Sequence, residues 1–132
     1  MLQRGDVYVV DQGGAHLDGP TIGDNLGNSI YAKTGNGIVY HGALRDIAGL
    51  KELGRFTSFF RSYHPSHHLN NPDGELNTTL VGINQPTRIG DAMVMPGDVV
   101  LGRDGAVVFI PPHLAEKVVT TSEIVRLRDM FG

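Results

Sequence analysis

The sequence contains no cysteine, no long apolar run and no excess of basic charge. The absence of cysteine excludes disulfides, thiolate nucleophiles and cysteine-based zinc or iron–sulfur sites, and it suits the reducing cytoplasm, where we expect the protein to be located. A formal net charge of −3, with the basic residues scattered, argues against direct binding to nucleic acid. No apolar run approaches the roughly 18 residues that a membrane helix needs, and no signal peptide is recognisable, so we expect no membrane partner.

What is present indicates one globular domain. The chain has 132 residues, enough for a hydrophobic core of its own. Its 18 glycines and 7 prolines have no period, which indicates many short elements joined by tight turns. We therefore expect a single domain over residues 1–132. Strands and helices alternate early and strands cluster late, so the expected class is α/β with a mixed sheet.

Apolar patterns and turn residues predict the individual elements. Short buried strands are expected at 6–11, 37–40, 56–60, 79–83, 98–101 and 106–110. Helices are expected from Pro20 to about Gly35, from Ala43 to Gly54, and from Pro112 onward, the last with a buried stripe of Leu114, Val118 and Val125. Residues 61–78 are polar and rich in turn formers, and we interpret them as a surface loop.

The first candidate site is the pair Arg45–Asp46, which follows a predicted buried strand. Ligand sites in α/β proteins tend to form where strands end. The pair offers an anion clamp and a metal ligand side by side, and Asp46 in a first helical turn also gains from the helix dipole. The alternative is a helix-terminal charge beside a surface arginine, and these two residues alone favour that alternative.

The second candidate is the stretch Gly23-Asp24-Asn25-Leu26-Gly27. Small and polar residues here let backbone N–H groups approach an anion closely. The alternative is a weak helix start with ordinary capping, which this stretch by itself favours.

The third candidate is a group of histidines, His64, His67 and His68, whose imidazoles could bind zinc or nickel. No acidic or cysteine ligand joins them in a compact motif, so a solvated loop is the better interpretation. His41 follows the strand at 37–40, and we expect it to lie near the site without controlling it.

Four blocks of the sequence, in order, resemble one family. Asp24 is separated by 20 residues from Arg45–Asp46, a D-x20-R-D spacing. Around it stand GDVYVVD, GNGIVYHGALRD with LKELGRFTSFFRSYHP, and MPGDVVLGRDGAVVFIPPHLAEKV. Over roughly residues 4 to 119 the chain resembles the 4-hydroxy-4-methyl-2-oxoglutarate aldolases and their RraA relatives, named for the regulator of RNase E activity A.

The resemblance implies a swivelling β/β/α fold in three layers, assembled as a homotrimer or a pair of trimers. It also implies that the domain is shortened at its N-terminus, because relatives carry further elements before the GDVYVVD strand. The aldolase members are similar to metal-dependent class II enzymes, which cleave 4-hydroxy-2-oxo acids to pyruvate and often decarboxylate oxaloacetate. Both reactions generate a pyruvate enolate, which a divalent cation and an arginine can stabilise.

The family motif implies a role for each matching residue. Asp46 would bind Mg²⁺ or Mn²⁺, Asp24 would hold a metal-bound water, and Arg45 would grip the substrate. Backbone amides of the loop formed by Gly23, Asp24, Asn25 and Leu26 would cradle the pyruvyl carboxylate. A neighbour's C-terminal acidic residue, here Glu116 or Glu123, would complete the metal's water shell.

Three functions follow, and the sequence favours the first. The chain is a metal-dependent lyase for a small oxo acid, a regulator that binds an RNA-degrading enzyme, or an inactive shortened homologue. Retention of Asp24, Arg45 and Asp46 favours the lyase. His41 stands where the family usually has aspartate, and Gly49 lies near where the aldolases carry an acidic residue, which favours the regulator.

Overall fold

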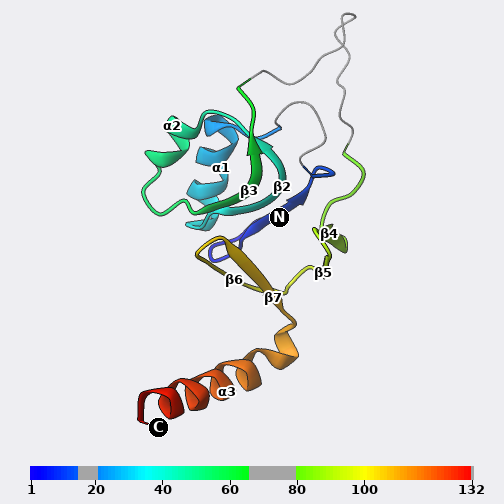
Figure 1. Ribbon diagram of the computed structural model, residues 1–132. Helices are drawn as coiled ribbons and strands as arrows, with labels where there is room; N and C mark the ends of the chain where they lie inside the picture. The colour runs from blue at the N-terminus through cyan, green and yellow to red at the C-terminus, as the bar shows by residue number, and fades with distance from the viewer. Residues whose placement is uncertain (15–20, 66–79, 132) are drawn as a thin grey trace, which may run out of the picture.

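The computed structural model describes residues 1–14, 21–65 and 80–131, and Figure 1 shows the course of the chain through them. Within these residues the elements follow in the order β1 (Tyr8–Asp11), α1 (Asp24–Thr34), β2 (Ile38–Leu44), α2 (Ile47–Lys51), β3 (Ser58–Tyr63), β4 (Thr87–Ile89), β5 (Ala92–Val94), β6 (Val99–Arg103), β7 (Ala106–Ile110) and α3 (Pro112–Phe131).

The first half forms a parallel sheet in the order β1-β2-β3, with α1 and α2 on one of its faces (Figure 1). Strand β2 is central, and six of its seven residues are buried, since neighbours cover both of its faces. The core under the helices consists of residues from the sheet, from α1, from α2 and from the segments that precede α1 and β3, namely Ile22, Ile30, Ile38, Tyr40, Leu44, Leu50 and Phe56.

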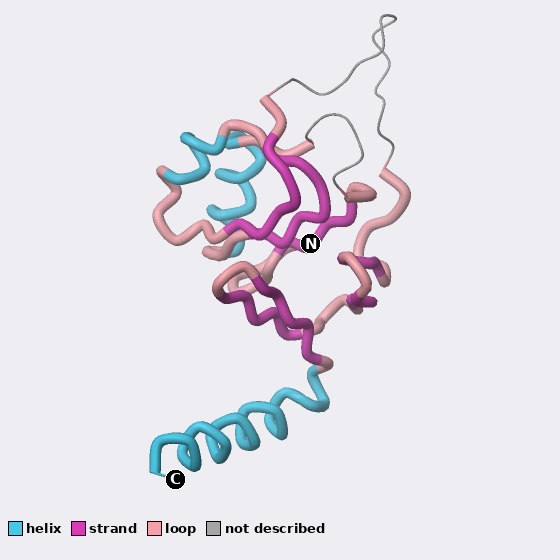
Figure 2. Tube along the Cα trace, viewed as in Figure 1, coloured by secondary structure: helices cyan, strands magenta, loops and turns pink. Residues whose placement is uncertain are grey.

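The second half consists of two antiparallel hairpins, β4–β5 and β6–β7, followed by α3. Figure 2 shows the hairpins beside the three-stranded sheet and α3 running away from both. No residue of α3 is buried. None of the helices in the described ranges is long and apolar enough to cross a membrane.

Several predicted elements are confirmed with shifted limits. Helix α1 ends at the predicted Gly35, which has a φ of 72° and donates its N–H to the Tyr31 carbonyl at 2.8 Å, a left-handed cap that glycine adopts without penalty. The helix begins at Asp24, however, because Ile22 pairs with Leu44 as an added parallel bridge. Strand β2 continues to Leu44 past the predicted end at Tyr40, so that α2 is shorter than predicted.

Other predictions were wrong in part or in full. The strand predicted at 56–60 shares only residues 58–60 with β3, which lies at Ser58–Tyr63, because Phe56 packs into the core beneath the helices. No strand occupies the described part of 79–83, and β4 and β5 follow it. The predicted buried stripe of α3 is exposed, with 40% of Leu114 and 48% of Val125 accessible. The loop predicted at 61–78 begins later than expected, because β3 continues to Tyr63, and its residues 66–78, with residue 79, lie outside the described residues.

Candidate site at the carboxyl end of strand β2

The candidate site forms where β2 ends beside the start of α1. Leu44 pairs with Ile22, and the Arg45 N–H donates to the Ile22 carbonyl at 3.1 Å. This short ladder holds the residues after Ile22 against the residues after Leu44. Gly23 and Asp24 are thereby placed next to Arg45 and Asp46, although about 20 residues of chain separate the two pairs.

Gly23 allows the backbone to approach the two functional side chains. A β-carbon at this position would overlap the Asp46 carboxylate and would lie 2.9 Å from Arg45 Nε. The φ of Gly23 is −128°, which any residue can adopt. The requirement for glycine is therefore one of space and not of backbone conformation.

Asp46 is held in a conformation that few residue types adopt. Its φ of 54° and ψ of 41° lie in the left-handed region, where a non-glycine residue costs about 1 kcal/mol or more and where aspartate is among the tolerated types. The position is fixed on both sides, because Asp46 is the N-cap of α2 and its carbonyl accepts the Leu50 N–H at 3.1 Å. Left-handed non-glycine residues cluster at functional sites.

Arg45 and Asp46 form a partly sheltered pair. Arg45 Nε lies 3.2 Å from Asp46 Oδ2, and the two side chains are 23% and 42% exposed. The pair is open enough for a small ligand to reach both charges. Arg45 also has a further interaction within the chain, so the contact with Asp46 is not its only one.

Asp24 is the first residue of α1, and its carboxylate is directed by two contacts. Oδ1 accepts the Asn25 N–H at 2.7 Å. Oδ2 lies against α2, where a β-carbon on Gly49 would come within 2.9 Å of it. Gly49 therefore provides the room that Asp24 occupies, which the sequence pattern alone did not indicate.

The amino end of α1 contributes partial positive charge at the same place. The first N–H groups of a helix have no partner within the helix, and the helix dipole favours an anion there. The helix begins at Asp24, with Gly23 as its N-cap and no side-chain cap. The Asn25 N–H already donates to Asp24 Oδ1, so the N–H of Leu26 is the one in this turn that is suited to an incoming carboxylate.

The carboxylates suit a small hard cation in the type of their donor atoms. Asp24 and Asp46 provide oxygen ligands, and Mg²⁺ is commonly held by one or two carboxylates while it keeps several waters. Among the described residues no group of three or more His, Cys, Asp or Glu side chains could enclose a metal. The donor set therefore fits magnesium that is bound by Asp46 and water, not a fully protein-enclosed metal.

The histidines are distributed differently from the predicted cluster. His64 donates its N–H to the Leu44 carbonyl at 3.0 Å and so lies at the end of β3 near the candidate site. His67 and His68 lie outside the described residues. His41 belongs to β2, where its Nδ1 is 2.9 Å from Asp11 Oδ1. The two predicted glutamates, Glu116 and Glu123, are on the exposed helix α3.

Fold and site together define a mixed α/β protein with a polar site at the carboxyl end of a parallel strand. A sequence model of the RraA-like family, described as Aldolase/RraA, matches residues 1–108, and the chain belongs to that family.

Solved structures agree with the assignment. Streptomyces coelicolor RraAS2, described as an unusual member of the RNase ES inhibitor RraA protein family, matches with a TM-score of 0.82 at 28% identity over 98% of this chain and 62% of its own. The RNA-processing inhibitor RraA of Thermus thermophilis gives 0.64 and 27% over 83% and 61% of the two chains.

An uncharacterized protein of Pseudomonas syringae pv. tomato str. DC3000 shares the fold, with a TM-score of 0.80 at 23% identity over 98% of this chain and 60% of that one. The chain thus spans about three fifths of the length of these relatives, whose lengths are covered to 60%, 61% and 62%. The expected RraA-like α/β fold, shorter than that of the relatives, is confirmed.

Proposed function

We propose that the chain is a metal-dependent lyase of the class II pyruvate aldolase or oxaloacetate decarboxylase type, which acts on small 4-hydroxy-2-oxo acids. The observation that carries the proposal is the meeting of Gly23 and Asp24 with Arg45 and Asp46 at one strand end. An anion-binding helix terminus, a guanidinium and two carboxylates are what the cleavage of an oxo acid requires.

In this proposal the first turn of α1, Arg45 and Asp24 each have a separate role. The amides of the first turn of α1 bind the substrate carboxylate. Arg45 donates to the oxygen that gains negative charge as the carbon–carbon bond breaks, and such a donor is most effective at a site that is fixed beforehand. Asp24 orients a water for proton transfer to the product carbanion, since its Oδ1 is already held by the Asn25 N–H.

Asp46 is the residue that would hold Mg²⁺ or Mn²⁺. A bound cation would supply Lewis-acid polarisation of the 2-keto oxygen. The contact between Asp46 Oδ2 and Arg45 Nε orients the carboxylate beside Gly23.

We further propose that the active unit is a homotrimer or hexamer, in which Glu116 or Glu123 of a neighbouring copy faces the site. Eight large apolar residues of α3 are at least 40% exposed, and an apolar helix surface of this size is suited to contact with another copy. They are Leu114, Val118, Val119, Ile124, Val125, Leu127, Met130 and Phe131.

Turnover of oxaloacetate and of 4-hydroxy-4-methyl-2-oxoglutarate, followed as pyruvate release, tests the function. We expect activity with Mg²⁺ or Mn²⁺, its loss in excess EDTA and its return when Mg²⁺ is restored. Full activity in excess EDTA would contradict the metal requirement. No turnover of either substrate by a folded oligomer with Mg²⁺ would contradict the lyase.

A second candidate function is a non-catalytic regulator that binds an RNA-degrading enzyme. It is favoured by the likeness to the RraA inhibitors at 28% and 27% identity. Co-sedimentation with purified RNase E, combined with inhibition of RNA cleavage by both the wild type and Asp46→Asn, would support it. If RNase E binds the wild type but not Asp46→Asn, the regulatory surface would include the proposed metal site.

A further inference from the structure

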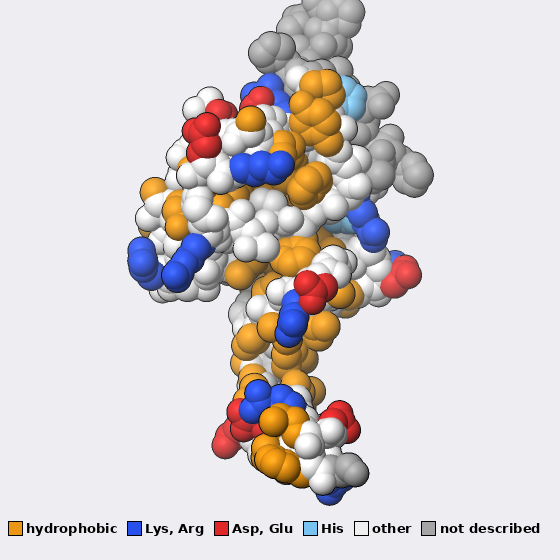
Figure 3. Space-filling model, turned by 60° about the vertical axis from the view of Figure 1, so that its left-hand side comes forward, with side chains coloured by type: hydrophobic (Ala, Val, Ile, Leu, Met, Phe, Trp, Pro, Cys, Tyr) orange, Lys and Arg blue, Asp and Glu red, His pale blue; other side chains and the backbone are white. Residues whose placement is uncertain are grey.

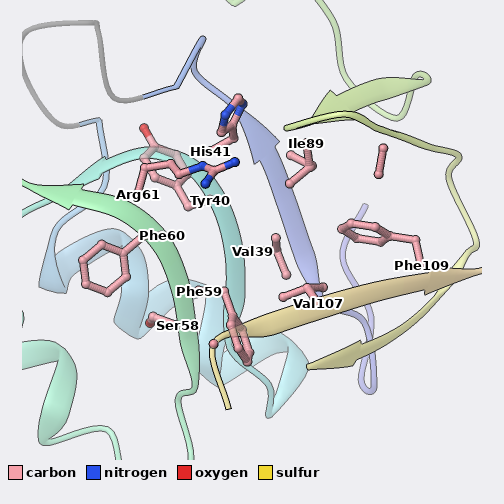
Figure 4. A pocket seen from close by; sticks show the side chains of 12 residues that line it. Val39, Tyr40, His41, Ser58, Phe59, Phe60, Arg61, Ile89, Val107 and Phe109 are labelled. Carbon is pink, nitrogen blue, oxygen red and sulfur yellow. The ribbon is translucent and has the colours of Figure 1, made fainter. Parts of the chain in front are cut away.

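A cavity lies on the opposite face of the sheet from α1 and α2. It has a volume of about 440 Å³, is partly open to solvent, and is lined by β2 and β3 on one side and by the two hairpins on the other (Figure 4). Alternation along β2 turns Val39 and His41 toward the cavity, while Ile38 packs into the core under the helices and Tyr40, also part of that core, borders the cavity. A volume of this size is typical of small-molecule sites.

The cavity has an apolar part and a cationic end. Figure 4 shows Arg61 and His41 at one end, with Phe59, Val107 and Phe109 further along it. Two aromatic rings and several aliphatic side chains therefore face the space that lies beyond the guanidinium. Pockets of this composition bind an apolar body and use the few polar groups to orient it.

Among the described residues, the charges at the cationic end leave Arg61 available to a ligand. No ion pair joins Arg61 to a carboxylate within residues 1–14, 21–65 and 80–131. The nearby Asp11 is already engaged, because its Oδ1 accepts the Gly13 N–H at 2.7 Å and lies 2.9 Å from His41 Nδ1. This bond also fixes the His41 ring beside the cavity.

We propose that this cavity binds a small aromatic monocarboxylate, with its carboxylate on Arg61 and its ring among Phe59, Val107 and Phe109. A guanidinium matches a carboxylate with two parallel donors, which a neutral amide ligand cannot use in the same way. The site is separate from the one at Arg45 and Asp46, and it does not depend on the proposed lyase activity.

Binding of 4-fluorobenzoate to the full chain, followed by ¹⁹F NMR line broadening in a titration, tests the proposal. We expect saturable binding, and binding of the neutral analogue 4-fluorobenzamide that is weaker by about tenfold or more, the usual effect of a lost charge-assisted bond. Arg61→Gln should weaken benzoate binding to a similar extent. The matched control Arg55→Gln removes another exposed arginine that does not line the cavity, and it should leave binding unchanged.

A filling variant and a variant of the other site complete the test. Val107→Phe should abolish binding because it occupies the cavity, whereas Arg45→Gln should leave benzoate binding intact. The proposal is overturned if benzoate does not bind, if Arg61→Gln binds it as tightly as the wild type, or if only Arg45→Gln weakens it. The last result would assign the benzoate to the oxo-acid site instead.

Discussion

Two residues, Gly23 and Asp46, have local features that together bring the backbone before α1 close to the Asp46 carboxylate. Gly23 has no side chain, so the backbone before α1 can reach the Arg45–Asp46 pair. Asp46 accepts a left-handed backbone, so its carboxylate is presented where β2 ends and α2 begins. Variants of the Arg45–Asp46 pair therefore test the function proposed for this site, with stability measured alongside.

Asp46→Asn is expected to reduce turnover of oxaloacetate by several orders of magnitude, because a neutral amide is a poor ligand for a hard cation. Asparagine also tolerates the left-handed region, so the fold should be preserved. The measurement is kcat with increasing Mg²⁺, together with the unfolding midpoint in urea. A variant that keeps wild-type kcat at ordinary Mg²⁺ would remove Asp46 from the proposed metal site.

Arg45→Lys is expected to lower kcat/KM by about 100-fold, or about 2.7 kcal/mol, because an ammonium cannot bond two substrate oxygens as a planar guanidinium does. Arg55→Lys is the matched control, since Arg55 is exposed in the segment between α2 and β3 and lies outside the D-x20-R-D motif, and its kcat/KM should be unchanged. A loss below about threefold in Arg45→Lys would make Arg45 a structural residue.

At the scale of the elements, Tyr40 of β2 links by hydrogen bonds the segment after β1 and the segment before α1. The Tyr40 hydroxyl donates to Gln12 Oε1 at 2.5 Å and is hydrogen-bonded to the Thr21 hydroxyl. These bonds join the residues that follow β1 to those that precede α1. The ring is 1% exposed, and burial is the main cause that raises the pKa of Tyr40 above its usual value.

The raised pKa of Tyr40 predicts a loss of stability in alkali. An unfolded tyrosine ionises near pH 10, and the folded chain holds its proton to higher pH, so the free energy of unfolding should fall as pH rises above about 10 and through the folded pKa. Urea unfolding across this range measures the slope. Tyr40→Phe cannot ionise, so it should be less stable at neutral pH but show a smaller alkaline loss. An equal slope in the two proteins would refute the assignment.

At the scale of the whole molecule, α3 is the helix that buries none of its residues against the rest of the chain. Figure 3 shows hydrophobic side chains along the hairpins and on α3, and none of the residues of that helix is buried. Because its apolar residues occur on more than one side, a stable monomer would leave much of that surface in water.

We therefore predict a homo-oligomer, with a trimer as the expected form, in sedimentation velocity at micromolar concentration. Leu127→Lys should shift the population toward the monomer, because it places a charge in an apolar part of α3. Lys117→Ala on the same helix is the control and should leave assembly unchanged. A monodisperse wild-type monomer with cooperative unfolding would contradict the prediction and leave Glu116 and Glu123 without a role at the site.

The sequence alone determined the features that depend on local order. The stop of α1 at Gly35, the strand Ala106–Ile110 and the start of α3 at Pro112 follow from turn residues and apolar periods, which act over a few residues. The D-x20-R-D spacing likewise identified Asp24, Arg45 and Asp46 as the candidate site, and the family match to residues 1–108 confirmed the RraA-like assignment.

Tertiary structure alone decided which surfaces meet. Ile22 lies outside α1 because it pairs with Leu44 in a parallel bridge. Phe56 lies outside β3 because it is buried in the core beneath the helices. The contacts of Gly23 with Asp46, and of Gly49 with Asp24, join positions far apart in the chain. An apolar pattern shows that a residue is suited to burial, but it does not show which surface would cover that residue. For this reason the stripe of α3 was predicted to be buried although it is exposed.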